Sequence, residues 1–239
     1  MTAALILLGL TYLFGSVPFG LVITTLYGGD LDIRQAGSAN IGATNVARLY
    51  GWRLAAPALA ADILKGLLPV LVASWLWPHS ALGWLGVVGG TAWLGHCFSI
   101  FLEFRGGKGV ATGAGVMLGI APLPTTASIA VWAIVLALSG RSSVAALTAV
   151  AAMVGFTWQL SPPALLVATL LAAGTLLTHL ANIERLFRGE EQPVVKSVRW
   201  NRAAPEQGSV EQLLAEGPAG AGSSPPQWRE TIDDPLSPH

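Results

Sequence analysis

Long apolar segments dominate the first 190 residues, and they restrict the possible fold more than any other feature of the chain. Seven such segments can be marked out, at 3–25, 54–77, 81–102, 109–120, 125–139, 144–160 and 163–183. Between the fourth and the fifth, residues 121–124 read APLP and are expected to form a turn. A helix of about 20 apolar residues crosses the hydrocarbon core of a bilayer. Only 11% of the residues are charged, whereas soluble domains have about a quarter. The sequence therefore predicts an all-α, polytopic membrane bundle of about seven transmembrane helices.

Outside the apolar segments, basic residues occur only in alternate connections and after the last segment. Twelve of the thirteen Lys and Arg residues fall on one side of a seven-helix arrangement, and Lys65 lies inside a segment. The positive-inside rule places that side in the cytoplasm, with the N-terminus outside and the C-terminus cytoplasmic. The short segment 109–120 decides this pattern, because the later helices invert if it only enters the bilayer without crossing it.

The composition changes after the last apolar segment. Residues 191–239 are rich in Pro, Gly, Ser, Glu and Gln, and such a segment cannot bury enough apolar surface to order itself. The sequence therefore predicts a transmembrane domain at 1–190 and a polar, disordered cytoplasmic tail at 191–239. The composition also argues against several other classes. The formal net charge is zero, so nucleic acid is not an expected partner. Cys97 is the single cysteine, and a lone cysteine is more typical of helix packing than of nucleophilic chemistry. No spacing typical of metal ligands occurs, so no metal or cofactor is expected.

Two glycine-rich polar loops interrupt the apolar pattern on the same predicted side of the membrane. They read GSANIGATN at 37–45 and EFRGGKGVAT at 103–112. Glycine lets backbone N–H groups face an anion without interfering side chains. Lys108 lies in the second loop and Arg48 directly follows the first, and both cations suit phosphate oxygens. We expect the two loops to form one phosphate-binding site.

The alternatives for each loop are structural. The sequence GGKG can be a tight turn whose lysine marks the membrane boundary, and the first loop can be a solvated turn with helix caps. The second alternative does not explain why two similar loops recur on one side. A Walker A site is excluded, because Leu102 stands where glycine is required and Gly109 where Ser or Thr is required.

Ionisable residues inside or at the ends of the apolar segments are further candidates. Asp62 and Lys65 are three residues apart on one helix face, either as a structural ion pair or as a functional pair, since such charges are costly in a membrane. His179 and Asn182 have the same spacing at the end of the last segment, and His179 can be a base, a phosphate ligand or neither. His96 is more typical of a packing histidine.

Three stretches of the sequence resemble one family. They are GSVPFG at 15–20 continuing through DIRQAGSANIGATNVAR at 32–48, GHCFSIFLEFRGGKGVAT at 95–112 and HLANIERLFRGEE at 179–191. Over residues 1–191 the chain resembles the acyl-phosphate:glycerol-3-phosphate acyltransferases of bacterial membranes (PlsY). The resemblance implies a seven-helix bundle in the bacterial inner membrane with its active site at the cytoplasmic face. It further implies transfer of a fatty acyl group from acyl phosphate to the sn-1 hydroxyl of glycerol 3-phosphate, without a cofactor.

The resemblance also implies the site residues and the partners. The expected catalytic residues are Lys108, Arg48, Ser38 and His179. The expected substrate-binding and phosphate-binding residues are Asn40, Gly42, Thr44, Asn45, Gly106, Gly107, Gly109, Thr112, Ser143 and Asn182. The expected partners are the two substrates, membrane lipids and the enzyme that makes acyl phosphate. A substrate phosphate or His179 is expected to take the proton of the attacking hydroxyl.

Three positions depart from the usual pattern of the family. Ala39 replaces a glycine, which costs about 1 kcal/mol if the position has a positive φ. Thr178 replaces a basic residue, and Ser99 replaces a proline. An alternative function is that of a transporter or lipid flippase, but neither an internal repeat nor a matching pair of broken helices is visible. A purely structural membrane subunit leaves the two polar loops unexplained.

Overall fold

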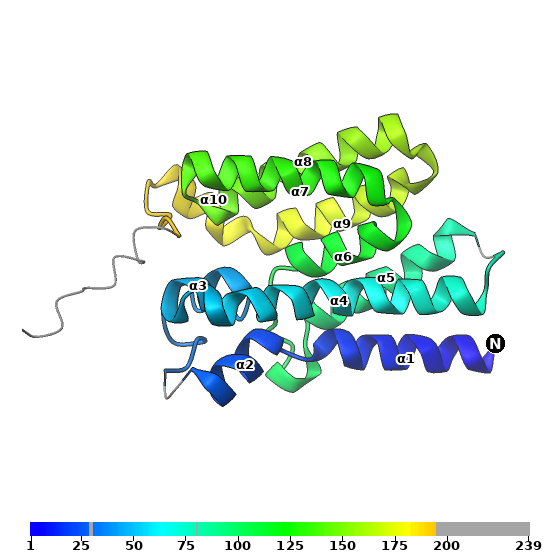
Figure 1. Ribbon diagram of the computed structural model, residues 1–239, viewed down its shortest axis with the longest axis horizontal. Helices are drawn as coiled ribbons and strands as arrows, with labels where there is room; N and C mark the ends of the chain where they lie inside the picture. Colours follow the sequence, from blue (N-terminus) through cyan, green and yellow to red (C-terminus); the bar gives the residue numbers. More distant parts are fainter. Residues whose placement is uncertain (29–30, 80, 195–239) are drawn as a thin grey trace, which may run out of the picture. The chain divides into compact units, whose positions relative to one another are not determined.

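The computed structural model describes residues 1–28, 31–79 and 81–194, which are helical and contain no strand (Figure 1). The all-α prediction is therefore confirmed for the described part of the chain. The α-helices are α1 (Thr2–Ser16), α2 (Phe19–Tyr27), α3 (Ala43–Tyr50), α4 (Trp52–Leu76), α5 (Leu82–Cys97), α6 (Val110–Ile120), α7 (Pro122–Ser139), α8 (Ser142–Leu160), α9 (Leu165–Thr178) and α10 (Leu180–Phe187). Two 3₁₀ turns, η1 (Ile100–Leu102) and η2 (Pro162–Ala164), complete them.

The described helices differ in how well they can cross a membrane. Four are long and apolar enough to do so: α4, α7, α8 and the helical stretch Leu82–Leu102. Two bent pairs raise the number to as many as six, α1 with α2 at 45° and Pro162–Thr178 with α10 at 58°. The 11 residues of α6 span only about 16 Å, half of the hydrocarbon core. The seven-helix count and the orientation stay predictions.

The bend between α1 and α2 is stabilised by side chains from other helices. Pro18 has no N–H group and interrupts the helix, which leaves carbonyl groups before it without helical partners. The hydroxyl of Ser99 donates to Ser16 O at 2.6 Å, and the ammonium of Lys65 donates to Val17 O at 3.0 Å. These contacts fix the bend against α4 and the end of α5.

The half-length helix α6 lies against α4 through small residues. A Cβ on Gly66 of α4 would overlap the carbonyl oxygen of Thr112, and one on Gly115 of α6 would overlap that of Ile63. Glycines permit such close backbone contact between membrane helices. The N-terminus of α6, which follows the GGKG loop, is thereby held beside α4.

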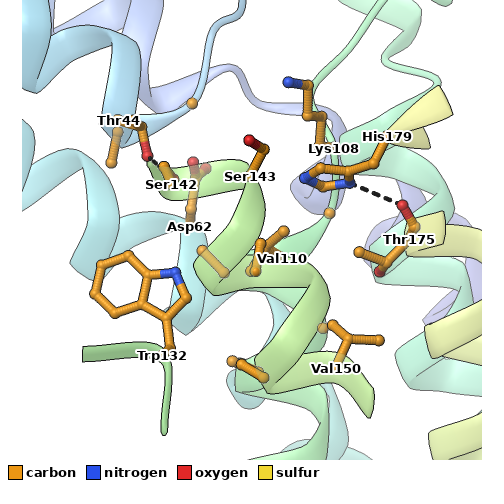
Figure 2. Close-up of a pocket in the computed structure, with 18 of the residues that line it drawn as sticks. Thr44, Asp62, Lys108, Val110, Trp132, Ser142, Ser143, Val150, Thr175 and His179 are labelled. Atoms are coloured by element: carbon orange, nitrogen blue, oxygen red, sulfur yellow. Dashed lines mark hydrogen bonds between the residues drawn. The ribbon is translucent and has the colours of Figure 1, made fainter. Parts of the chain in front are cut away.

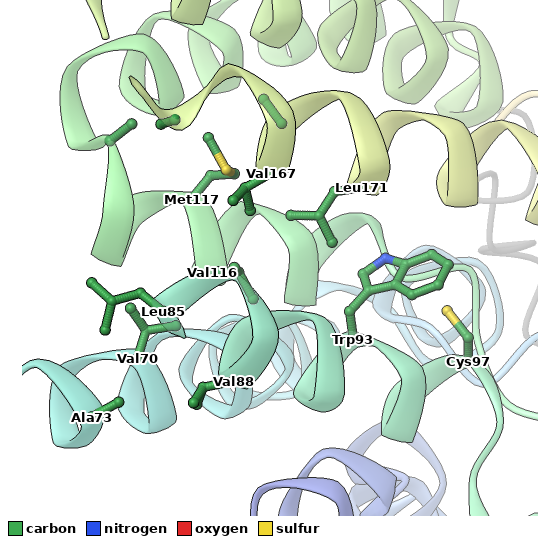
Figure 3. Close-up of a cluster of buried hydrophobic side chains, with 13 residues drawn as sticks. Val70, Ala73, Leu85, Val88, Trp93, Cys97, Val116, Met117, Val167 and Leu171 are labelled. Atoms are coloured by element: carbon green, nitrogen blue, oxygen red, sulfur yellow. The ribbon is translucent and has the colours of Figure 1, made fainter. Parts of the chain in front are cut away.

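Apolar side chains of α4, α5, α6 and α9 form the main core next to this contact (Figure 3). Val70, Val88, Val116 and Met117 are almost completely buried there, and Trp93 extends the cluster towards the end of α5. A second cluster of buried apolar residues supports the first polar loop: Ile33, Ile41, Val46, Ala47, Ala55 and Ala58. Each predicted loop therefore rests on its own buried apolar base.

Two local features differ from the sequence-based expectation. Residues 121–124 were expected to form a turn, but α7 begins at Pro122, because proline is tolerated in the first turn of a helix. The first polar loop ends in the short helix α3, which carries Thr44, Asn45 and Arg48 and was not predicted.

The predicted tail begins within the described part of the chain. Residues 191–194 run back past the C-terminal end of α7, where Val194 N donates to Gly140 O at 2.7 Å. Residues 195–239, on which most of the tail prediction falls, lie outside the described residues.

Candidate active site

A cavity of about 240 Å³ brings both polar loops together with the ends of α8, α9 and α10 (Figure 2). Lys108 and Arg48 both line it, as expected for one shared anion site. The other sequence-predicted residues that line it are Ser38, Asn40, Gly42, Thr44, Asn45, Gly109, Ser143, His179 and Asn182. Gly106, Gly107 and Thr112 are not among the lining residues.

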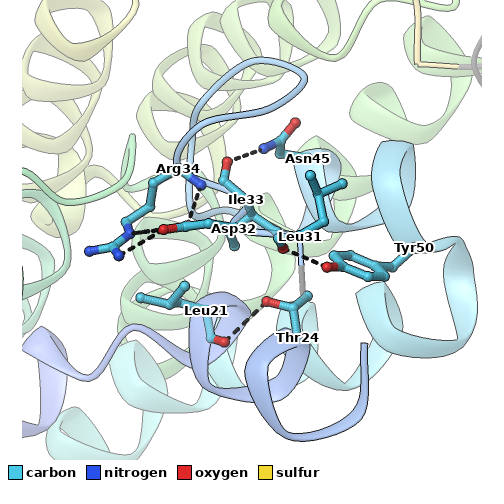
Figure 4. A network of polar contacts seen from close by, with 8 residues as sticks. All are labelled: Leu21, Thr24, Leu31, Asp32, Ile33, Arg34, Asn45 and Tyr50. Atoms are coloured by element: carbon cyan, nitrogen blue, oxygen red, sulfur yellow. Dashed lines mark hydrogen bonds and ion pairs between the residues drawn. The ribbon is translucent and has the colours of Figure 1, made fainter. Parts of the chain in front are cut away.

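The first loop is organised around the side-chain amide of Asn45, which is 1% exposed. Its Nδ2 donates to Ile33 O at 2.9 Å and to Ala36 O at 3.1 Å (Figure 4 shows the first bond). Its Oδ1 accepts from Ser38 N at 2.9 Å and from Arg48 Nη1 at 3.3 Å. Asn45 therefore holds the loop closed and sets the positions of Ser38 and Arg48.

Ala39, which replaces a glycine of the usual family pattern, has a φ of 54° and therefore the left-handed conformation that glycine favours. Ala39→Gly is expected to stabilise the protein, because glycine relieves about 1–2 kcal/mol of steric strain and loses about half of that gain through unfolded-chain entropy. Thermal unfolding in detergent should shift upward by about 1–3 °C. Ala36→Gly, a loop position without a positive φ, is the matched control and should not stabilise. A lower unfolding temperature for Ala39→Gly would show that the backbone at Ala39 is not strained.

The glycines of the second loop have a packing role that the sequence did not indicate. Gly106 N donates to Cys97 O and Gly107 N donates to His96 O, both at 2.9 Å. A Cβ on Gly106 would overlap His96 O, and one on Gly107 would overlap the imidazole of His96. The N–H groups of Gly106 and Gly107 are thus already bonded to carbonyl groups, and these two glycines let the loop lie against α5.

The loop is held from its other side by Thr178, whose hydroxyl donates to Lys108 O at 2.9 Å. This threonine is the one that replaces a basic residue of the usual pattern. Thr112 was expected to bind phosphate, but it is fully buried at the α4–α6 contact. Lys108 is therefore positioned by α5 and α9 together.

The electrostatics of the cavity favour an anion. Burial lowers the pKa of Lys108 to about 8; Glu191 opposes this shift, and the charges of Arg185 and Arg48 add to it. Burial likewise lowers the pKa of Arg48. Cations gathered in a partly buried site repel one another, and a bound phosphate relieves that repulsion.

Glu191 lines the cavity but was not predicted as a site residue. Its Oε1 accepts from Asn182 Nδ2 at 2.7 Å and its Oε2 accepts from Arg185 Nε at 2.8 Å. Burial alone would raise the pKa of this carboxyl group, but Ser143, Asn182 and Arg185 together lower it. Glu191 therefore stays ionised and fixes Asn182 at the rim of the cavity. In the sequence, Glu191 was indicated only as the last residue of the stretch HLANIERLFRGEE, which resembles the family.

His179 lies between α9 and α10 and is oriented by α9. Its Nδ1 lies 2.8 Å from Thr175 O (Figure 2), and because a carbonyl oxygen only accepts, Nδ1 carries the proton. The second ring nitrogen, Nε2, is left for the cavity. Across the cavity, the hydroxyl groups of Thr44 and Ser142 lie 3.0 Å apart and join α3 to α8.

Several buried polar atoms of lining residues have no hydrogen-bond partner within the described chain. Two of them are Arg48 Nε and Asn182 Oδ1. Leaving such atoms unsatisfied is costly, which is consistent with a polar ligand in this part of the cavity. The other walls are apolar and include Ile63, Trp132, Val150, Met153 and Leu171. The cavity therefore suits a molecule with a charged end and an apolar chain.

Comparisons with known proteins agree with one another. The family profile described as glycerol-3-phosphate acyltransferase matches residues 5–189. The glycerol-3-phosphate acyltransferase of Erythrobacter litoralis (strain HTCC2594) is 45% identical over 186 residues, which cover 77% of this chain and 91% of the relative. That of Solidesulfovibrio magneticus (strain ATCC 700980 / DSM 13731 / RS-1) is 45% identical over 202 residues, 84% of this chain and 98% of the relative. The crystal structure of PlsY (YgiH), an integral membrane glycerol 3-phosphate acyltransferase in its glycerol 3-phosphate form, is similar with a TM-score of 0.74. The identity is 35%, and the match covers 80% of this chain and 95% of that chain.

Proposed function

The chain belongs to the glycerol-3-phosphate acyltransferase family, and from this premise we propose that acyl phosphate is its acyl donor. The acyl group is transferred to the sn-1 hydroxyl of glycerol 3-phosphate, giving 1-acyl-glycerol 3-phosphate (lysophosphatidic acid) and inorganic phosphate. The observation that supports this most directly is the single cavity that combines Lys108 and Arg48 with an apolar wall. Two phosphorylated molecules, one of them carrying a fatty chain, need such a combination.

The reaction needs no covalent intermediate with the protein. The hydroxyl oxygen of glycerol 3-phosphate attacks the carbonyl carbon of acyl phosphate, the new ester C–O bond forms, and phosphate leaves with the electron pair of the anhydride bond. Two phosphate dianions repel each other strongly in a site of low dielectric constant. Lys108 and Arg48 offset this repulsion and hold the hydroxyl close to the carbonyl group, while Ser38 and Asn40 at the cavity wall supply further hydrogen bonds.

The proton of the attacking hydroxyl has two acceptors within this proposal. His179 Nε2 is one, because its partner Nδ1 is bonded to Thr175 O and the ring orientation is therefore fixed. A phosphate oxygen of a substrate is the other, and it requires no side-chain base. His179→Ala separates them, since loss of a base removes the acidic limb of the pH–rate profile and loss of a ligand mainly raises KM.

The fatty chain has a place along the apolar walls of α7, α8 and α9. The cavity of about 240 Å³ accommodates the reacting groups and the first part of the chain, and the remainder extends between helices into lipid. The protein is an integral membrane protein, and we place it in the bacterial inner membrane with the active site facing the cytoplasm. The distribution of basic residues supports this orientation, and the enzyme that makes acyl phosphate would then supply the donor from the same side.

Release of phosphate from acyl phosphate by the purified protein tests the proposal. Phosphate should appear only when glycerol 3-phosphate is also present, together with 1-acyl-glycerol 3-phosphate detected by mass spectrometry. Release without the acceptor would indicate a hydrolase, and uptake into vesicles without turnover would indicate a transporter. Either result would overturn the acyl-transfer proposal.

The pH dependence of the reaction should report Lys108. Because the pKa of Lys108 is lowered to about 8, its charge is present below that pH and is lost as the pH rises through it. We expect kcat/KM, which reports the free enzyme, to fall above about pH 8. Lys108→Arg should move this alkaline limb upward, since a guanidinium stays charged. An unmoved limb in Lys108→Arg would assign it to another group.

A further inference from the structure

The proposed reaction makes no use of the most deeply buried charges in the structure. Asp62 is 2% exposed and Lys65 is fully buried, and Lys65 Nζ lies 2.9 Å from Asp62 Oδ1. Both are on α4, in a helix long enough to cross the membrane. Charged groups at such positions are costly and usually have a function.

The two members of this pair face different surroundings. Lys65 is turned away from the cavity, with its ammonium bonded to Val17 O and 5.7 Å from the centre of the Phe19 ring. Asp62 lines the cavity (Figure 2). Its carboxylate is therefore neutralised from behind by a cation that a ligand in the cavity does not reach.

His96 joins Asp62 at the cavity wall. Its Nδ1 lies 3.7 Å from Asp62 Oδ1, which is too far for a hydrogen bond. Within the described chain, Nδ1 of His96 has no hydrogen-bond partner, whereas Oδ1 of Asp62 has only its ion pair with Lys65. Asp62 and His96 are 2% and 4% exposed, so a buried imidazole nitrogen without a partner lies beside a buried carboxylate at the cavity wall, and a small polar group of a ligand can bind to both.

We propose that Asp62 and His96 form a hydroxyl-binding subsite that holds the hydroxyl group of glycerol 3-phosphate that is not acylated. The inference rests on the proposed function and adds a substrate contact to it. A phosphate group does not suit this subsite, because its ionised oxygens and the carboxylate oxygens of Asp62 are all hydrogen-bond acceptors. A hydroxyl donates to a carboxylate and accepts from an imidazole N–H, so it matches both groups at once.

The other carboxylate at the cavity is not available for this task. Both oxygens of Glu191 already accept hydrogen bonds, from Asn182 and from Arg185. The remaining polar residues at the wall are mainly donors suited to phosphate oxygens. Among the described lining residues, Asp62 is the carboxylate left for a hydroxyl. Holding the second hydroxyl there also decides which hydroxyl reaches the acyl carbonyl.

A cycle that removes the hydroxyl and the carboxylate in turn tests the subsite. The substrates are glycerol 3-phosphate and propane-1,3-diol monophosphate, which lacks only the second hydroxyl. The main variant is Asp62→Leu/Lys65→Met, because removing both charges avoids leaving one of them buried and unpaired. Asp62→Asn is the second variant. The measured quantity is the ratio of kcat/KM for the two substrates, which does not depend on the fraction of active protein.

The wild-type protein should prefer glycerol 3-phosphate by about 10- to 100-fold, as expected for a hydroxyl bonded to a charged group. The Asp62→Leu/Lys65→Met variant should prefer it by no more than about threefold. Arg48→Lys is the matched control: it should lower kcat/KM for both substrates and keep the wild-type ratio. The ligand-induced rise in unfolding temperature, measured with each substrate, gives the same comparison for a variant too slow to assay.

Three results would overturn the inference. An unchanged ratio in the double variant would mean that Asp62 does not bind this hydroxyl, and this includes the case in which Asp62 accepts the proton of the reacting hydroxyl, since both substrates would then suffer equally. A wild-type ratio near one would mean that the second hydroxyl is not recognised. A wild-type protein that does not acylate glycerol 3-phosphate would overturn the proposed function and the subsite with it.

Discussion

Lys108→Ala is expected to lower kcat/KM by about a thousandfold while the protein stays folded in the membrane. An ammonium about 4 Å from a phosphate charge contributes about 4 kcal/mol at an effective dielectric constant of 20, and each 1.36 kcal/mol is a factor of ten in rate. Arg48→Ala should also remove most of the turnover, because the guanidinium lines the same cavity. The measurement is the initial rate of phosphate release by the purified variants.

Arg105→Ala is the matched control for this prediction. Arg105 belongs to the same loop, three residues before Lys108, but it is exposed and does not line the cavity. Its removal should leave kcat/KM within about twofold of wild type, because exposed charges are strongly screened. Thermal unfolding of all three variants shows whether a loss of rate is a loss of fold. Full activity in both Lys108→Ala and Arg48→Ala would remove these residues from the site.

The helical fold could largely be predicted from the sequence, because the lengths of apolar segments reflect the thickness of the bilayer. What could not be predicted is how helices end and pack. Pro122 was expected in a turn but begins α7, because proline breaks a helix in its interior and is tolerated in its first turn. The contact of Gly66 with Thr112 involves residues distant in sequence, and no local pattern indicates it.

The meeting of the two polar loops could also be predicted, because both carry cations on one side of the charge pattern. The tasks of individual residues could not. Asn45 looked like a phosphate ligand, yet its amide is occupied by Ile33, Ala36, Ser38 and Arg48. An asparagine in a polar loop has the same local appearance in both roles, and only its distant partners distinguish them.

Glu191 shows a different limit of sequence reasoning. The composition changes near residue 190, so the predicted domain boundary separated Glu191 from the residues with which it bonds. Composition is an average over a long window, whereas the bonds to Asn182 and Arg185 are a property of one side chain. The chain therefore contributes to the cavity beyond its last apolar segment.

Gly106→Ala is expected to lower kcat/KM by about a hundredfold and to lower the unfolding temperature by several degrees. The added Cβ would overlap the carbonyl oxygens of His96 and Cys97, so the loop must move away from α5. It would then lose the bonds that Gly106 N and Gly107 N donate to α5. Lys108 is two residues further on, and a displacement of about 1 Å in an active site costs about a hundredfold in rate.

This result separates the packing role of the glycines from the phosphate-binding role expected from the sequence. Alanine keeps the backbone N–H group, so a loop whose N–H groups bound phosphate in open space would tolerate the change with nearly wild-type activity and stability. Gly90→Ala is the matched control, because a Cβ there on α5 meets no atom within 4 Å and should be neutral or stabilising in a helix. Wild-type behaviour of Gly106→Ala would contradict the close contact with α5 and would favour direct phosphate binding, because only a loop detached from His96 has room for the methyl group.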